Sequence, residues 1–252
     1  MKYVLAWIRI VLCSLILLLG MIYLFIADLI GWHTERHGFH VRRLYIRIAR
    51  WILGIRLEVV GEPLATPGLY VSNHRTLSDP LMTLDRLYAY VIAKQEVRGY
   101  PLLGKGASLT GTMFVKRNDK DHRRAVRETI RDILRDGKNV LIYPEGTTNV
   151  KPFTAQFSKG SLEVAMELGV PIVPVTVEYR DMQDYWRQPK LLNQFVAQFG
   201  KWRSHVFIHF HKPFLTDNLN TALRRVQIEI DGDIAHYHGY DDHSISGHPE
   251  AQ

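Results

Sequence analysis

Cysteine is nearly absent from this sequence. Cys13 is the single cysteine among 252 residues, which excludes an internal disulfide framework and a cysteine-based zinc site. Cys13 also lies in an apolar run, where formation of a reactive thiolate is disfavoured. Ser72 and Ser78 lack the Gly-x-Ser-x-Gly elbow of many serine hydrolases. These absences argue against thiol catalysis, and no sequence motif identifies a serine or cysteine as a nucleophile.

Acidic residues are in the minority, with 25 Asp and Glu against 32 Lys and Arg, for a formal charge of +7. Such a charge suits nucleic acid, anionic lipid or a phosphorylated substrate equally well. Nucleic acid is the weakest of the three, because the aromatic-basic platforms of the usual modules are missing. The length and the lack of internal repeats fit one α/β domain with a small appendage.

Long apolar runs are also scarce, and the one that stands out covers residues 10–27. Its 18 residues are uncharged and reach the usual length of a membrane-spanning helix. Its end offers no small-residue cleavage site of a secretory signal peptide. We therefore predict a membrane anchor, with a buried helix of a soluble protein as the alternative.

Residues 39–55 follow as a basic amphipathic helix, typical of a lipid interface. The alternative is an ordinary packing helix with a solvated face. Arginine is denser after the apolar run than before it, so the positive-inside rule predicts that the domain that follows lies on the cytoplasmic face of the membrane. A single span and a re-entrant hairpin both fit. The basic residues of this helix are Arg42, Arg43, Arg47 and Arg50.

Beyond residue 55, short apolar strands alternate with helices. The predicted strands cover residues 56–60, 69–71, 88–93, 112–116, 139–143, 172–179 and 206–210. The predicted helices cover residues 121–136, 158–168 and 217–230. The fold class is therefore α/β, a mixed sheet flanked by helices with an N-terminal membrane-embedded helical segment. We expect membrane-anchoring helices in residues 1–55, one domain in 56–230 and a disordered tail in 231–252.

The first chemical motif follows the predicted strand at residues 69–71. His74 is a plausible general base, because a neutral imidazole accepts a proton near pH 7. Asp79 could hold the other ring nitrogen and stabilise the imidazolium. Ser78 and Pro80 supply a helix start between the strand and the next helix. A surface or capping pair is the plainer interpretation of a histidine near an aspartate.

Two further motifs follow strands. Residues 111–117 form a strand that brings Lys116 and Arg117 to its end on opposite faces, so one of them can point into a shared pocket. In Pro144-Glu145-Gly146-Thr147, the glycine permits a tight turn whose N–H groups can face an anion, and the threonine adds a hydroxyl. Glu145 would pair with a cation such as Arg117 or accept a hydrogen bond from a substrate hydroxyl.

The fourth motif, residues 170–175, is apolar with two prolines and predicts an edge strand or a groove wall, and a core strand is equally consistent with it. Together the four resemble the blocks of the glycerolipid acyltransferases, the lysophosphatidic acid (1-acyl-sn-glycerol-3-phosphate) acyltransferase group. The match consists of Asn73-His74 with Asp79, Gly111 through Phe114 to Arg117, Pro144-Glu145-Gly146-Thr147, and Val170 through Pro174. Supporting matches are Lys94 with Pro101 and Gly104, and Phe157-Ser158-Lys159-Gly160. The resemblance covers roughly residues 55 to 180, and four ordered blocks are more specific than any one.

The resemblance implies a membrane-bound O-acyltransferase that moves a fatty acyl group to the hydroxyl of a lyso-lipid, first of all 1-acyl-glycerol-3-phosphate. It implies His74 as base and Asp79 as its orienting partner. It also implies no cofactor, because the donor, acyl-CoA or acyl-carrier protein, is a substrate. Membrane lipids are further partners. The predicted substrate-binding residues are Asn73, Thr76, Lys94, Arg117, Glu145, Gly146 and Thr147.

One departure concerns the acceptor, because the family often has arginine directly after Glu-Gly-Thr and this chain has Thr148. Another lysophospholipid or an ornithine- or glycine-type lyso-lipid would also fit. Lysines that could substitute for the missing cation are Lys94, Lys105, Lys151 and Lys159. A serine esterase using Ser72 or Ser78 and a non-catalytic membrane-surface protein are the competing hypotheses. We predict no metal site, although His209 and His211 share one strand face and His236, His238, His243 and His248 follow.

Overall fold

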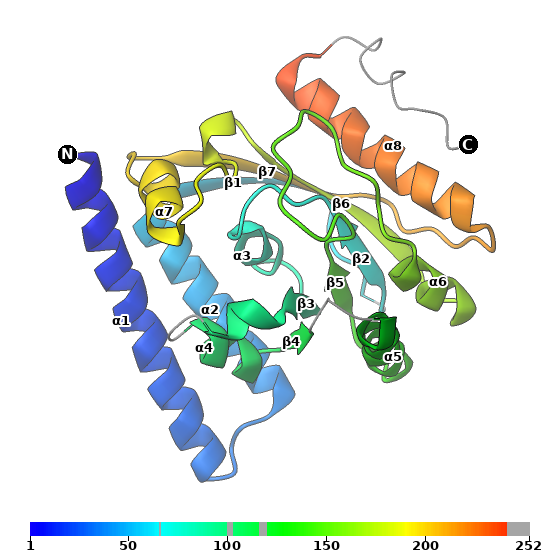
Figure 1. Cartoon of the computed structure of the whole chain (residues 1–252). Helices are drawn as coiled ribbons and strands as arrows, with labels where there is room; N and C mark the ends of the chain where they lie inside the picture. The colour runs from blue at the N-terminus through cyan, green and yellow to red at the C-terminus, as the bar shows by residue number, and fades with distance from the viewer. Residues whose placement is uncertain (66, 100–102, 116–119, 241–252) are drawn as a thin grey trace.

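A computed structural model of the chain describes residues 1–65, 67–99, 103–115 and 120–240 (Figure 1). The strands are β1 (Ile55–Val60), β2 (Leu69–Ser72), β3 (Tyr90–Lys94), β4 (Thr112–Val115), β5 (Val140–Ile142), β6 (Ile172–Tyr179) and β7 (Ser204–Phe210). The helices are α1 (Lys2–Leu29), α2 (Glu35–Leu53), α3 (Asp79–Thr83), α4 (Leu103–Leu109), α5 (Lys120–Arg135), α6 (Gly160–Glu167), α7 (Leu191–Phe199) and α8 (Leu219–His238). Two short 3₁₀ helices, η1 (Gln95–Gly99) and η2 (Met182–Asp184), complete the described elements.

The strands form one mixed sheet in the order β1-β7-β6-β2-β5-β3-β4, which confirms the predicted fold class. The five strands from β6 to β4 are parallel to one another. β7 is antiparallel to β6, and β1 is parallel to β7. Since parallel strands end at the same edge of a sheet, the loops after β2, β5 and β6 meet there, where ligands bind in open α/β sheets.

Helices cover both faces of the sheet (Figure 1). On one face, α2, α3 and α7 pack against the odd-numbered residues of β6, from Val173 to Tyr179. On the other face lie α5, α6 and α8. Every residue of β6 is buried, as expected of a strand covered on both faces.

Of the interpretations of residues 170–175, the edge strand is wrong and the core strand is confirmed, because β6 lies between β2 and β7. Pro174 is tolerated in β6 because it has no N–H to donate and lies where the ladder of hydrogen bonds between β6 and β7 is interrupted. The ladder with β7 ends at Phe210, and an isolated bridge joins Ile172 to Phe214. Between the two, His211 N–H donates to the carbonyl of Pro174 at 3.1 Å.

The prediction of a disordered tail from residue 231 is wrong as far as Tyr240. α8 continues to His238 and ends at Gly239, whose φ of 68° makes a left-handed cap. Ile230 and Ile234 are fully buried at helical spacing, and Asp231 accepts hydrogen bonds from Thr154 N–H (2.8 Å) and Oγ1 (3.0 Å). The polar residues at 231–233 therefore lie inside a helix, and residues 241–252 lie outside the described part.

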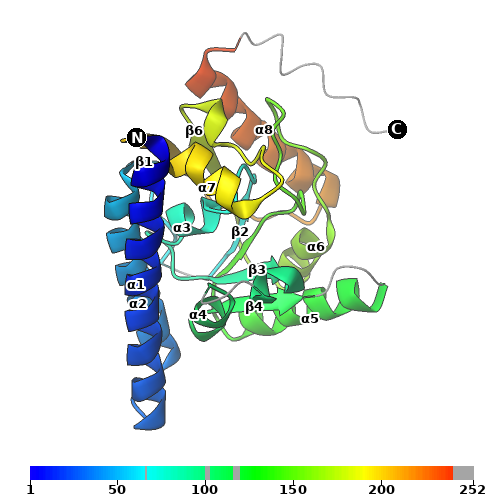
Figure 2. The same cartoon turned by 60° about the vertical axis from the view of Figure 1, so that its left-hand side comes forward.

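The N-terminal helices form a hairpin along one flank (Figures 1 and 2). α1 is long and apolar enough to cross a membrane, and most of its surface is exposed. Arg9, buried in this helix, donates to the carbonyls of Phe199 (2.9 Å), Lys201 (2.5 Å) and Trp202 (3.0 Å), next to the end of α7. The N-terminal part of α1 is thus fixed to the domain.

Three arginines of α2 bind the domain, rather than lying on a free basic face as predicted. Arg42 is buried and donates to the carbonyls of Thr110 (2.6 Å) and Ala89 (2.9 Å). Arg47 and Arg50 pair with the buried Asp85 at 3.3 and 3.0 Å. The exposed face of α2 instead carries an apolar stripe at helical spacing, made of Leu44, Ile48 and Trp51.

Candidate active site

His74 and Asp79 are brought together by the turn between β2 and α3. His74 Nδ1 lies 2.8 Å from Asp79 Oδ2. The same carboxylate oxygen accepts the backbone N–H groups of Arg75 (2.6 Å) and Thr76 (2.9 Å), and Tyr179 O–H donates to Oδ1 at 2.7 Å. Asp79 is fully buried. A carboxylate at Nδ1 assigns the proton to that nitrogen and leaves Nε2 as the acceptor.

Three residues beyond β5 hold His74 in place. Its ring stacks on Tyr143, with centroids 4.4 Å apart and planes at 30°. Its backbone N–H donates to Glu145 Oε1 at 2.9 Å, and its carbonyl accepts Asn149 N–H at 2.7 Å. The imidazole is therefore fixed from both its ring face and its backbone, as general-base catalysis requires.

Both oxygens of Glu145 are used by the protein. Oε1 accepts His74 N–H, and Oε2 accepts Asn149 Nδ2 and Ala155 N–H, each at 2.8 Å. Burial raises the pKa of Glu145 above its usual value, although the three donors oppose this. The geometry assigns Glu145 to the support of the loop, a role that the sequence did not indicate.

The turn after Glu145 is closed by Gly146, whose φ of 72° favours glycine. Its N–H donates to the carbonyl of Tyr143 at 3.0 Å. This N–H therefore closes the turn, whereas the sequence had suggested that it could face an anion. Thr147 is exposed at the tip, and Thr148 beside it is half-buried.

Asn73 and Thr76, predicted to contact substrate, are buried. The amide of Asn73 donates to the carbonyl of Val177 (2.9 Å) and accepts its N–H (2.8 Å). Thr76 Oγ1 donates to Gln198 Oε1 at 3.3 Å. These contacts give both side chains a positioning role in the loop.

Arg75 and Glu178 form a buried ion pair that the sequence did not reveal. Arg75 Nε and a terminal nitrogen donate to Glu178 Oε2 at 3.0 and 2.8 Å. The guanidinium also binds the carbonyls of Lys151 (2.6 Å) and Pro152 (2.7 Å). Although burial opposes it, the contact with His238 and the charge of Arg75 lower the pKa of Glu178. The pair ties the His74 loop to the segment after β5.

The predicted cations of the site are only partly described. Lys94 ends β3, but its side chain, that of Lys105 and the whole of Arg117 lie outside the described residues. Lys151 is exposed, and Lys159 Nζ lies 3.9 Å from Glu163 on α6.

Neither serine beside His74 is placed as a nucleophile. Ser72 is fully buried and donates to the carbonyl of Asn73 at 3.0 Å. Ser78 is also buried, and its Oγ accepts Gln198 Nε2 at 3.0 Å. The arrangement thus supports a histidine base without a serine relay.

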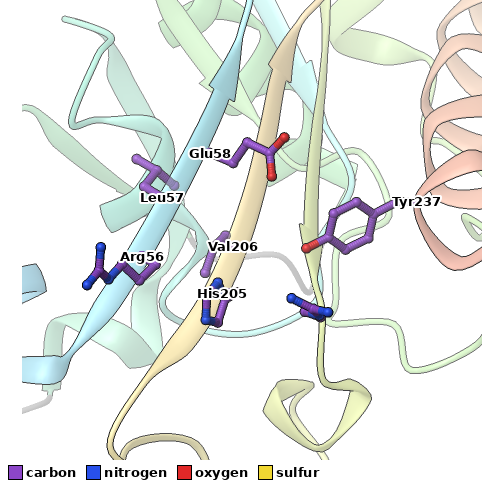
Figure 3. A pocket seen from close by; sticks show the side chains of 7 residues that line it. Arg56, Leu57, Glu58, His205, Val206 and Tyr237 are labelled. Atoms are coloured by element: carbon purple, nitrogen blue, oxygen red, sulfur yellow. The ribbon is translucent and has the colours of Figure 1, made fainter.

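A hollow of about 380 Å³ lies elsewhere, on the α8 face of β1 and β7 (Figure 3). It is lined by Arg56, Leu57, Glu58, Arg180, His205, Val206 and Tyr237. His74 and Asp79 lie on the α3 side of the sheet instead, so the chemistry rather than this hollow identifies the site.

Similar proteins indicate the family and the fold of this chain. Residues 56–178 match the family model described as Acyltransferase. A lyso-ornithine lipid O-acyltransferase of Pseudomonas aeruginosa is 33% identical over 174 residues, 65% of this chain and 66% of that protein. A 1-acyl-sn-glycerol-3-phosphate acyltransferase of Borreliella burgdorferi is 29% identical over 150 residues, 56% of this chain and 59% of that protein. The chain thus spans less than two thirds of the length of these relatives.

The fold also matches a solved structure. The crystal structure of the 1-acyl-sn-glycerophosphate (LPA) acyltransferase PlsC from Thermotoga maritima has a TM-score of 0.69 and 18% identity, over 98% of this chain and 100% of that one. At this identity the likeness shows the fold alone. With the family match, it means that the chain carries, in residues 56–178, a domain of the Acyltransferase family.

Proposed function

We propose that this protein transfers a fatty acyl group to the hydroxyl of a lyso-lipid. The observation that carries the proposal is the His74–Asp79 pair, 2.8 Å apart at the edge where the parallel strands end, within a domain of the Acyltransferase family. Relatives named as acyltransferases of lyso-ornithine lipid and of 1-acyl-sn-glycerol-3-phosphate support it.

In the proposed reaction, His74 Nε2 takes the proton of the acceptor hydroxyl. The oxygen attacks the carbonyl carbon of an acyl thioester, carried by CoA or by acyl-carrier protein. The new C–O bond forms, the C–S bond breaks, and the thiolate takes the proton from the imidazolium. Asp79 stabilises that imidazolium. A positioned base contributes about 10²–10⁴-fold, and the remainder comes from positioning and from stabilising the oxyanion.

The first acceptor we propose is 1-acyl-glycerol-3-phosphate, in line with the family resemblance. A second candidate, an amino-acid lyso-lipid such as lyso-ornithine lipid, is favoured by one observation. Thr148 stands where the family often has an arginine, so this turn offers a phosphate no charge at that position.

The test is transfer from a labelled acyl thioester to a panel of lyso-lipids in detergent micelles. We expect the wild type to transfer and His74→Ala to lose activity. His205→Ala, which changes a histidine at the hollow on the other face, is the matched control and should stay active. Equal transfer by wild type and His74→Ala in folded protein would contradict the proposal. A shift of Thr148→Arg toward lysophosphatidic acid would identify residue 148 as a specificity element.

We further propose that α1 and α2 enter one leaflet as a hairpin, with the domain on the cytoplasmic face. Arg9 ties one end of α1 to the domain, α2 leads into β1, and the far ends of both helices extend beyond the domain (Figure 2). Leu44→Glu with Trp51→Glu should reduce flotation with anionic vesicles, whereas Leu215→Glu, at an exposed apolar residue far from the hairpin, should not. Cysteines introduced by Lys2→Cys and Gly239→Cys should both resist an impermeant maleimide in intact cells. Labelling of residue 2 alone would indicate a full span.

A further inference from the structure

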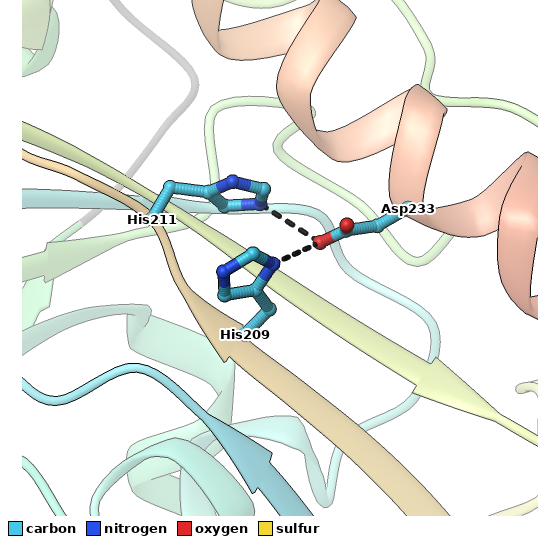
Figure 4. Close-up of side chains that lie close together, drawn as sticks. All are labelled: His209, His211 and Asp233. Carbon is cyan, nitrogen blue, oxygen red and sulfur yellow. Dashed lines mark hydrogen bonds and ion pairs between the residues drawn. The ribbon is translucent and has the colours of Figure 1, made fainter.

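Three side chains converge between β7 and α8, away from His74. His209 lies in β7, His211 just after its end, and Asp233 in α8. Residues two apart on a strand point to the same face, and here that face is covered by α8. Figure 4 shows both rings directed at the Asp233 carboxylate: His209 Nδ1 and His211 Nε2 each lie 2.9 Å from Asp233 Oδ2. The three ligand atoms lie within 4.8 Å of one another.

The cluster is held in place before any ligand arrives. The two imidazole centroids are 3.9 Å apart. Thr176 Oγ1, from β6, donates to the same oxygen of Asp233 at 2.7 Å. Two imidazoles and one carboxylate therefore share a partly buried site.

A second carboxylate lies at the outer side of the cluster. Glu229 precedes Asp233 by one helical turn, and its Oε2 lies 3.6 Å from His211 Nδ1, the nitrogen that faces away from Asp233. This Oε2 is buried and has no hydrogen-bond partner among the described residues, whereas Oε1 accepts Arg225 Nε at 2.8 Å. A carboxylate at the outer nitrogen of a histidine fixes the tautomer and orientation of a metal-binding imidazole.

We propose that His209, His211 and Asp233 bind a divalent first-row transition metal, with Zn²⁺ as the first candidate and Glu229 orienting His211. Two imidazole nitrogens and one carboxylate oxygen are ligands that zinc favours, whereas Mg²⁺ and Ca²⁺ favour oxygen alone. Bonds of about 2.0–2.1 Å in a tetrahedral site separate ligand atoms by roughly 3.3 Å. The present 2.9 Å contacts thus need to open by only a few tenths of an ångström.

The position of the cluster predicts a structural role for the metal. Its ligands join β7 to α8, and Thr176 is followed in β6 by Val177 and Glu178, the partners of Asn73 and Arg75. The site lies on the face of the sheet opposite α3. A bound metal would therefore stabilise the domain behind the active site and take no part in acyl transfer.

The test uses the full chain without a histidine tag, stripped with a chelator and titrated with Co²⁺ and Zn²⁺ at neutral pH. We expect one equivalent to bind, with visible Co²⁺ bands typical of tetrahedral nitrogen and oxygen ligation. At a metal concentration of 100 times Kd, the melting temperature should rise by roughly 5–10 °C. His209→Asn with His211→Asn should weaken binding at least 100-fold. Glu229→Gln should weaken it by about 10–100-fold.

Two control variants separate this site from adventitious binding. His243→Asn with His248→Asn changes histidines near the end of the chain, and His205→Asn changes one on the same face of β7 outside the cluster. Both should bind metal as the wild type does. Circular dichroism checks that each variant is folded. If the variant with His209→Asn and His211→Asn is unfolded, the metal affinity of Glu229→Gln tests the proposal instead. No binding by the wild type, binding lost with His243 and His248, or unchanged affinity in a folded cluster variant would each overturn the proposal.

Discussion

Tyr179 allows a test of whether Asp79 acts by orienting His74. Tyr179 is too deeply buried to contact substrate, so a change there acts only through Asp79 and the core. Its hydroxyl donates to Asp79 Oδ1 at 2.7 Å, and the residue is 1% exposed. Burial raises the pKa of Tyr179 well above its usual value, so it stays a neutral donor throughout the working range of pH. Tyr179→Phe removes this donor while keeping the ring.

The expected magnitude follows from the charge on Asp79. A hydrogen bond to a charged group contributes about 1.5–3 kcal/mol. Its loss leaves Asp79 held on one oxygen and loosens the orientation of His74. If about half of that energy is expressed in the transition state, kcat falls about 4- to 13-fold, since about 1.4 kcal/mol is a factor of ten. KM should change less than twofold, because no substrate contact is removed.

The assay is steady-state acyl transfer together with thermal unfolding, and Tyr70→Phe is the matched control. Tyr70 is also fully buried in the same core cluster, and its hydroxyl accepts Leu64 N–H at 3.0 Å, away from Asp79. Its variant should lose about 1 kcal/mol of stability with kcat unchanged. If Tyr179→Phe lost stability yet kept kcat within twofold of wild type, Tyr179 would not position the catalytic pair.

Three further perturbations probe the support of the site. Glu145→Gln should lower both melting temperature and kcat, because an NH₂ group would replace one of the two carboxylate oxygens that together accept three N–H groups. Unchanged acyl transfer would contradict the supporting role of Glu145. Arg75→Met should cost about 3–5 kcal/mol in chemical unfolding, because it leaves Glu178 buried without its cation. Burial raises the pKa of Asp184 from 3.8 to about 6, so the folded state holds a proton that the unfolded state has released. Stability should therefore fall by about 2 kcal/mol as pH rises from 4 to 6, a slope that Asp184→Asn should lack in unfolding measured across this range.

The local geometry of the site could be predicted from the sequence. A strand, a turn and a helix start within eight residues define how His74 meets Asp79, and α3 does begin at Asp79. β6 has the predicted bounds of 172–179. These features depend on neighbours in the chain, so periodicity and cap residues are enough to predict them.

Contacts across the sheet could not be predicted in this way. Tyr179 lies 100 residues from Asp79, and Glu178 lies 103 from Arg75. Both meet the first loop because β6 pairs with β2, which strand prediction alone does not reveal. The prediction of a free basic face on α2 is wrong for a similar reason, since Asp85 and the carbonyl of Thr110 lie on other elements. Amphipathic periodicity shows a polar face, but it does not show what that face binds.

The support of the His74 loop also indicates where substrate preference can vary. Each of the four residues from Asn73 to Thr76 is bound by a different partner from another part of the chain. These partners are Val177, Glu145, Glu178 and Gln198, in that order. A loop held at every residue is preorganised for proton transfer and tolerates little change. Among the described residues, no hydrogen-bond partner holds the side chain of Thr147, exposed at the neighbouring turn, or of Thr148 beside it. Changes of acceptor should therefore arise at this turn, with the catalytic loop unaltered.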